Sequence, residues 1–126
     1  MELKDKIQEC YRKATSYPDL VKNLIGIGIE SYTVDVSSSA ILYRLGEGQT
    51  VLHASQTELR SIELNFDREK TIQAIRNNQQ GATDYAGFMR EIGKSGVRFY
   101  EATLNGPNRR VTYIGIGGFY EEAIPL

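Results

Sequence analysis

The chain has 126 residues, 40% of them hydrophobic and 25% charged, which indicates a soluble globular protein large enough to bury an apolar core. Its 15 basic and 16 acidic residues are scattered and leave a net charge of −1, so we expect no nucleic-acid partner. Cys10 is the only cysteine and His53 the only histidine, which excludes an internal disulfide and a metal site built from clustered cysteines or histidines. We predict no metal and no other cofactor.

Two helices and three strands are predicted in the first half of the chain. Apolar residues recur at helical spacing near the amino terminus, and Ser16 is a favourable N-cap for a second helix. Gly28 follows that helix, where left-handed backbone ends a helix without a steric penalty. Alternating apolar residues then predict strands through Tyr32, through Tyr43 and near residues 50–54.

The same order of elements is predicted in the second half. Residues 61–66 alternate as a short strand or an extended connector, and Asp67 then caps a helix that ends at Gly81. Asp84 caps the next helix, and strands follow through Tyr100, through Tyr113 and near residues 119–124.

Targeting signals are also missing from the sequence pattern. The first six residues are charged and contain no apolar stretch, so we expect no signal peptide. The longest apolar run, near residues 24–29, is interrupted by glycines and too short to span a bilayer. We therefore predict a cytoplasmic protein without a membrane partner.

The two halves match each other when the sequence is shifted by 68 positions. Five identities then fall within 23 aligned positions: Ala14, Thr15, Tyr17, Gly28 and Tyr32 align with Ala82, Thr83, Tyr85, Gly96 and Tyr100. The cap, helix face, turn and strand face all keep register, which indicates an internal duplication. We predict an α+β fold with helices on one side of the strands. One domain, residues 1–126, would hold two pseudo-symmetric repeats, each with two helices followed by an antiparallel three-stranded meander. Repeat one would cover about 2–54, a connector 55–66, and repeat two about 67–124.

The second half also carries a motif that resembles a known family. The motif comprises Asn78 to Tyr85 (NQQGATDY), Phe88, Gly96-Val97, Thr112-Tyr113 and the ending Glu122 to Pro125 (EAIP). It resembles the YbcV-like family, bacterial and prophage proteins of unknown function that are sometimes labelled phage envelope protein. The resemblance implies an α+β fold and a bacterial or phage source, and it transfers no catalytic residues. Met89 and Tyr100 stand where the resemblance leads us to expect a cysteine and a tryptophan.

No motif assigns a catalytic centre. The glycines of residues 46–48 and 115–118 fit hairpin bends, because neither group has the Gly-Lys-Ser/Thr ending of a phosphate loop. His53 could act as a general base only with a nucleophile or substrate within reach. Its counterpart in the second repeat is predicted to be Ala123, so the duplicated scaffold does not require a histidine.

Tyrosine is the one unusually frequent residue, with eight copies against four phenylalanines and no tryptophan. Six of them form three repeat-related pairs: Tyr17/Tyr85, Tyr32/Tyr100 and Tyr43/Tyr113. Tyrosine combines a large apolar ring with a polar tip, which suits both cores and partner-facing grooves. Two interpretations stay open: the rings are structural, or several hydroxyls converge on a small pocket or partner between the repeats. We expect Tyr32 and Tyr100 to be core residues.

We predict a non-enzymatic binding or interaction module of bacterial or prophage origin. Its partner is an unknown protein or small molecule, and a homodimer is left open. The candidate binding residues are Tyr17, Tyr43, His53, Tyr85 and Tyr113. The alternative is a small-molecule enzyme that uses His53 with nearby tyrosines or carboxylates.

Overall fold

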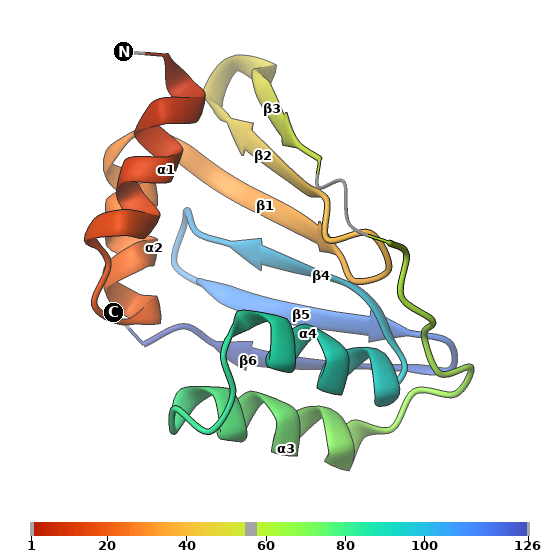
Figure 1. The fold of residues 1–126 in the computed structure, drawn as a ribbon. Coiled ribbons are helices and arrows are strands. Elements are labelled where there is room, and N and C mark those ends of the chain that lie inside the picture. Colours follow the sequence, from red (N-terminus) through yellow and green to blue (C-terminus); the bar gives the residue numbers. More distant parts are fainter. Residues whose placement is uncertain (1, 55–57, 126) are drawn as a thin grey trace.

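Six antiparallel strands form one sheet, and two pairs of helices lie against one of its faces (Figure 1). The computed structural model describes residues 2–54 and 58–125. In chain order the elements of these residues are α1 (Leu3–Lys13), α2 (Tyr17–Gly26), β1 (Ile29–Asp35), β2 (Ile41–Leu45), a short 3-10 helix (Gly46–Gly48), β3 (Thr50–His53), α3 (Arg68–Gln79), α4 (Tyr85–Lys94), β4 (Val97–Thr103), β5 (Arg110–Gly115) and β6 (Gly118–Ala123). The predicted α+β class is confirmed.

Three of the helices begin at the capping residues that the sequence predicts. The side-chain oxygens of Ser16, Asp67 and Asp84 each accept a hydrogen bond from the backbone amide three residues further on, at 3.2, 3.0 and 2.8 Å. These bonds satisfy one of the amides that have no partner in the first turn of a helix. The caps therefore fix where α2, α3 and α4 start.

A glycine with left-handed backbone separates each second helix from the strand that follows it. Gly28 has φ +95° and Gly96 has φ +88°, so both positions favour glycine. A Cβ atom on Gly28 would meet nothing within 4 Å, whereas on Gly96 it would lie 2.4 Å from the backbone oxygen of Asn65. Gly96 thus serves a second purpose, because the connector before α3 passes directly over it.

The strand order is β3-β2-β1-β4-β5-β6, so the sheet is centred on the antiparallel pair of β1 and β4. Tyr43 of β2 lies opposite Tyr32 of β1, and Tyr113 of β5 lies opposite Tyr100 of β4. Tyr32 lies opposite Ala102, two residues from Tyr100, in the central pair. Because the side chains of a strand alternate between faces, all four rings point to the same face of the sheet.

That face carries the core and is the one covered by helices. The exposed fractions are 3% for Tyr32 and Tyr43, 6% for Tyr113 and 7% for Tyr100. The expectation that Tyr32 and Tyr100 are core residues is therefore confirmed. On the opposite face Phe119 is 64% exposed. The four buried strand tyrosines thus belong to one apolar core that the helices and the sheet share.

The connector between the halves forms no strand at residues 61–66 and bends at residues 64–65. The backbone amide of Arg60 donates to the backbone oxygen of Ser37 at 2.9 Å, and that of Glu63 donates to Gly93 at 2.9 Å. Its backbone is thus tied to both halves of the molecule. Residues 55–57, where the predicted connector begins, lie outside the described residues.

Candidate functional site

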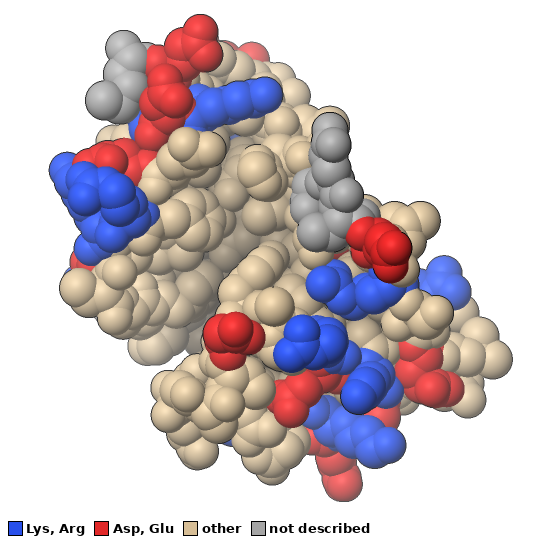
Figure 2. Space-filling view, viewed as in Figure 1, with Lys and Arg blue, Asp and Glu red and all other residues tan. Residues whose placement is uncertain are grey.

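A cleft opens on the helix side of the sheet, between the α1–α2 pair and the α3–α4 pair. It holds about 460 Å³, which lies in the usual range of small-molecule pockets. Figure 2 shows a hollow without charged side chains in the middle of this face, with lysines, arginines and acidic residues around its edges. Six tyrosines from both halves line it: Tyr11, Tyr17, Tyr32, Tyr85, Tyr100 and Tyr113. We call it the tyrosine cleft.

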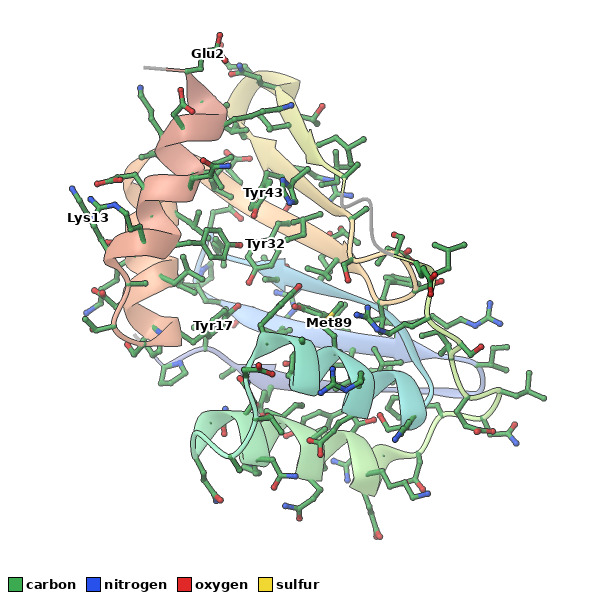
Figure 3. All side chains as sticks on the ribbon, viewed as in Figure 1. Glu2, Lys13, Tyr17, Tyr32, Tyr43 and Met89 are labelled. Atoms are coloured by element: carbon green, nitrogen blue, oxygen red, sulfur yellow. The ribbon has the colours of Figure 1, made fainter. Side chains whose placement is uncertain are left out.

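The tyrosine hydroxyls of the first half bond to one another. The Oη atoms of Tyr11 and Tyr43 are 2.8 Å apart, and those of Tyr17 and Tyr32 are 2.7 Å apart. Figure 3 shows Tyr17, Tyr32 and Tyr43 following one another along this side of the molecule. Burial raises the pKa of Tyr17 to about 12, against the lowering effect of its bond to Tyr32, and burial also raises the pKa of Tyr43. These hydroxyls therefore stay protonated and neutral at physiological pH.

Tyr113 in the second half is buried but has an unused hydroxyl. Its ring packs against Tyr100 at a centroid distance of 5.3 Å and stacks on Tyr120 at 6.4 Å. No hydrogen bond joins its hydroxyl to any residue that the structure describes, although the side chain lines the tyrosine cleft. Burial raises the pKa of Tyr113, so the group that faces the cleft is a neutral O–H.

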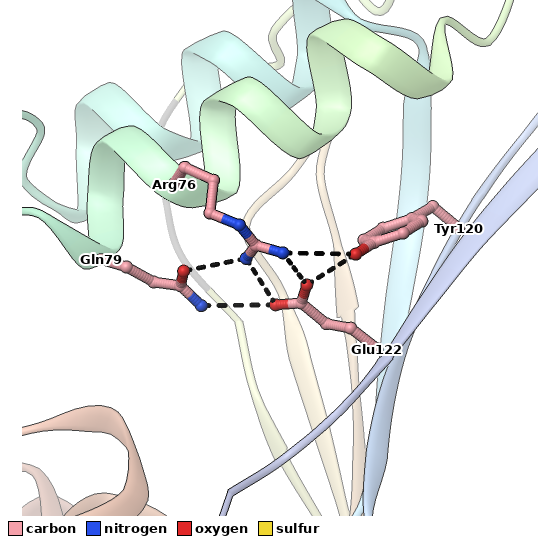
Figure 4. A network of polar contacts seen from close by, with 4 residues as sticks. All are labelled: Arg76, Gln79, Tyr120 and Glu122. Carbon is pink, nitrogen blue, oxygen red and sulfur yellow. Dashed lines mark hydrogen bonds and ion pairs between the residues drawn. The ribbon is translucent and has the colours of Figure 1, made fainter.

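A polar network joins Gln79 and Glu122 of the cleft lining to Arg76 and Tyr120 (Figure 4). Arg76 of α3 forms a two-pronged ion pair with Glu122 of β6, with Nη2–Oε2 at 2.8 Å and Nη1–Oε1 at 3.2 Å. Tyr120 donates its hydroxyl to Oε2 at 2.7 Å, and the side-chain amide of Gln79 donates to Oε1 at 3.3 Å. Each oxygen of the Glu122 carboxylate thus accepts two hydrogen bonds.

This network keeps the Glu122 carboxylate ionised and fills its acceptor positions with hydrogen bonds from neighbouring side chains. Burial raises the pKa of the Glu122 carboxyl, but the hydrogen bonds from Arg76 and Tyr120 outweigh it and hold the pKa below its ordinary value. A carboxylate whose oxygens are already hydrogen-bonded is a poor proton acceptor. The cleft therefore offers neutral hydroxyls and apolar surface, with the one lining charge compensated by Arg76.

The candidate residues from the sequence take different places. Tyr17, Tyr85 and Tyr113 line the tyrosine cleft, and Tyr43 lies behind it, bonded to Tyr11. Tyr17 and Tyr85 are also 39% and 51% exposed, which places them at the mouth. Burial raises the pKa of Tyr85, against the lowering effect of the neighbouring Tyr100 hydroxyl.

His53 does not belong to the group. It lies exposed on the edge strand β3 and is not among the residues that line the cleft. The predicted alignment of His53 with Ala123 is also wrong. His53 pairs with Ile41, and the residue that pairs with Val111, 70 positions after Ile41, is Glu122.

The shift by one residue comes from the length of a hairpin. Arg44 pairs with Thr50, six positions further on, whereas Ile114 pairs with Phe119, five positions further on. The connection from Ile114 to Phe119 is thus one residue shorter than the connection from Arg44 to Thr50. A sequence comparison without strand pairing cannot place such a difference in length, because the glycine-rich bends on both sides offer several alignments.

Sequence reasoning missed several residues of the site, above all Tyr11, Gln79 and Glu122. Tyr11 belongs to the apolar stripe of α1, so its spacing indicated only a core position. A usable signal existed for the other two. Residues that carry the family resemblance in two separate segments, 78–85 and 122–125, meet in the lining of one cleft: Asn78, Gln79, Tyr85, Glu122, Ala123, Ile124 and Pro125.

The described ranges 2–54 and 58–125 contain no group of three histidine, cysteine, aspartate or glutamate side chains placed to hold a metal ion. No helix in the same ranges has the length and apolar character needed to cross a bilayer.

The family described as "Protein of unknown function (DUF1398)" matches residues 5–118, and the chain belongs to this family. No curated protein matches the sequence. The family description indicates no function, so the function must be argued from the residues of the tyrosine cleft.

Proposed function

We propose that the protein is a binding module that takes up a small, largely apolar molecule in the tyrosine cleft. The observation that carries the proposal is the cleft itself, about 460 Å³ in volume and lined by aromatic and aliphatic side chains from both halves. Its polar side chains, Asn78, Gln79 and Glu122, come from α3 and β6 on one side. An apolar cavity with a few placed polar groups is the usual form of a small-molecule site.

Binding is favoured over catalysis by the state of the polar groups. The tyrosine hydroxyls in the cleft have raised pKa values, so they donate hydrogen bonds but are poor bases at neutral pH. The acceptor positions of Glu122 are filled by Arg76, Tyr120 and Gln79. His53, on which the enzyme alternative depends, lies outside the cleft, so no observation favours that alternative.

We also propose that the two halves are repeats and that the cleft lies at the boundary between them. Each half has two helices followed by three strands. In the central pair Thr33 lies opposite Glu101, its counterpart 68 positions later, as a twofold relation between β1 and β4 requires. A duplication would bring equivalent tyrosines together from both sides. Relatives with higher identity between their halves would support it, and relatives in which one half aligns with an unrelated fold would contradict it.

The origin and location follow as further proposals. The residues 78–85 and 122–125 support membership of the YbcV-like group, with a bacterial or prophage source. The single cysteine, Cys10, supports a cytoplasmic protein. The sequence of the genome around the gene tests the first proposal, and fractionation of the source cells tests the second.

A neutral fluorescent probe tests the proposed binding site. N-phenyl-1-naphthylamine, which brightens in apolar surroundings, should bind saturably to the full chain. Leu20 lines the cleft from α2 and is partly buried, so Leu20→Trp should fill the space and weaken the binding at least tenfold. Leu64 is 63% exposed on the connector, so Leu64→Trp is a matched control that should bind as the unaltered chain does. Circular dichroism verifies the fold of both variants.

Two results would overturn the proposal. Equal probe binding by the Leu20→Trp and Leu64→Trp variants would show that the probe binds elsewhere. Dimerisation of the probe-free chain that Leu20→Trp abolishes and Leu64→Trp preserves would show that a second copy, and not a small molecule, occupies the cleft. Sedimentation velocity over a range of protein concentrations detects that second result.

A further inference from the structure

We infer that the ligand of the tyrosine cleft is an uncharged molecule with an apolar body and one polar group that hydrogen-bonds to the hydroxyl of Tyr113. The inference rests on the proposed function and narrows it to a chemical class. It depends on two separate observations, the unused hydroxyl of Tyr113 and the balance of charge around the cleft.

In the described part of the chain, the hydroxyl of Tyr113 has no tyrosine partner like the one that the corresponding hydroxyl of Tyr43 has. Tyr43, opposite Tyr32 in the first half, bonds to Tyr11 of α1 at 2.8 Å. The residue of α3 that stands 68 positions after Tyr11 is Gln79. Gln79 donates to Glu122 and accepts from Arg76 instead of reaching Tyr113.

The result is a hydroxyl on a buried ring that a ligand in the cleft can bond to. Tyr113 is 6% exposed and lines the cavity, yet its hydroxyl has no partner among residues 2–54 and 58–125. The hydroxyl oxygen itself is not sealed from solvent, so a ligand group that accepts from it replaces a contact with water by a hydrogen bond inside the cleft. A hydroxyl, carbonyl or ether oxygen or a ring nitrogen meets this need, because each accepts from an O–H.

The charge around the cleft favours an uncharged molecule. Among the described residues, Glu122 is the only charged side chain in the lining, and its carboxylate is paired with Arg76 and accepts from Tyr120 and Gln79. An anionic ligand would find no cation in the lining and would lie near this carboxylate. A cationic ligand would find no free acceptor on Glu122. A charged molecule would thus lose its hydration without gaining a partner.

Four molecules with the same ring system test the inference by displacement of N-phenyl-1-naphthylamine from the full chain. Naphthalene offers no polar group, 2-naphthol a neutral hydroxyl, 2-naphthoate a negative charge and 2-naphthylmethylammonium a positive charge. We expect 2-naphthol to bind about three- to tenfold more tightly than naphthalene, the gain expected from one hydrogen bond. Both ions should bind more weakly than naphthalene.

Two tyrosine variants test whether the preference for 2-naphthol over naphthalene depends on the hydroxyl of Tyr113. Tyr113→Phe should reduce the affinity for 2-naphthol to that for naphthalene and leave naphthalene binding unchanged. Tyr43→Phe removes the corresponding hydroxyl of the first half, which is already bonded to Tyr11, and should keep at least the original preference for 2-naphthol. Circular dichroism and the unchanged naphthalene affinity verify that the cleft is intact.

The failures of the two proposals are distinguishable. If none of the four molecules displaces the probe and the probe itself does not bind, the proposed function is wrong. If naphthalene binds but 2-naphthol gains nothing, or if an ion binds most tightly, the binding site stands and the assigned ligand class is wrong. A 2-naphthol preference that survives Tyr113→Phe would also overturn the inference.

Discussion

Tyr43 and Tyr113 hold corresponding places in the two halves of the molecule, but their hydroxyls are used differently. Tyr43 lies opposite Tyr32 and Tyr113 opposite Tyr100, and both rings are buried. The hydroxyl of Tyr43 bonds to Tyr11, whereas that of Tyr113 has no partner within the described residues. In the first half the buried tyrosine hydroxyl is thus hydrogen-bonded within the protein, whereas in the second half the corresponding hydroxyl is free to bond to a molecule in the cleft.

The difference shows which positions maintain the fold and which shape the site. Both halves keep a capping residue, Ser16 or Asp84, and a left-handed glycine, Gly28 or Gly96. They differ at Glu122, which lines the cleft, because the corresponding strand position in the first half is the exposed His53 outside it. Since caps and turns determine helices and strands, changes at the cleft alter hydrogen bonding without altering the frame.

The largest expected effect comes from removing the rings that both halves use in the same way. Tyr32→Ala and Tyr100→Ala each delete a buried ring, which costs about 3–5 kcal/mol of unfolding free energy. A domain of this size has about 5–15 kcal/mol in total, so the double variant should be unfolded. Phe119→Ala, at a residue that is 64% exposed, should cost about 1 kcal/mol or less and serves as a control. Urea denaturation measures all four.

The pattern of these losses also tests the likeness of the halves. Two large losses are expected, because Tyr32 and Tyr100 occupy the same buried face of adjoining strands. One large and one small loss would show that the halves support their cores differently. Two small losses would show that the rings line an open groove and contribute little to the core.

Much of the frame could be predicted from the sequence because local residues determine it. Ser16, Asp67 and Asp84 cap helices through bonds to amides three residues away, and such spacing is visible in a sequence. The alternation around Tyr32 and Tyr100 correctly placed their strands and their buried faces. The connector stayed ambiguous, because alternation alone does not tell whether a segment has a neighbouring strand to pair with.

The site was less predictable because it depends on which strands and helices come together. The tyrosine pairs suggested converging hydroxyls but did not reveal that Tyr11 satisfies Tyr43 while Gln79 turns to Glu122. Arg76 and Glu122 are 46 positions apart in the chain, and only the contact of α3 with β6 joins them. Such a network has no local spacing that a sequence pattern can show.

An intermediate effect is expected where the halves differ in charge. Glu122→Gln removes the ion pair with Arg76, while His53→Gln changes the exposed residue at the corresponding strand position. The first should cost about 1.5 kcal/mol of unfolding free energy, because hydrogen bonds to charged groups are strong but solvent reaches Arg76. The second should change neither stability nor probe binding. Equal small effects at pH 7 would show that the Glu122 network contributes nothing.

The pH dependence of the Glu122→Gln effect has a defined sign. The pKa of Glu122 in the folded protein lies below its ordinary value of 4.5, so its contribution to stability is present above that value. It is lost as the pH falls through the folded-state pKa. The difference in unfolding free energy between the unaltered chain and Glu122→Gln should therefore be constant near neutral pH and shrink in acid. Urea titrations at a series of pH values measure it, and a gap that widens in acid would contradict the assignment.

The smallest effects should come from removing single hydroxyls, and they return to the pair of tyrosines that distinguishes the halves. Tyr43→Phe breaks the bond to Tyr11 and should cost about 1 kcal/mol of unfolding free energy. Tyr113→Phe removes a hydroxyl that has no partner among the described residues, so in the absence of any ligand it should change the unfolding free energy little. Both variants keep the ring, so the packing against Tyr32 or Tyr100 is unchanged and the comparison isolates the hydroxyl. Urea denaturation of the two variants in parallel, without naphthalene compounds, measures the difference. Equal losses would show that the Tyr113 hydroxyl is already satisfied in the free protein, and the reason for assigning it to a ligand would then be gone.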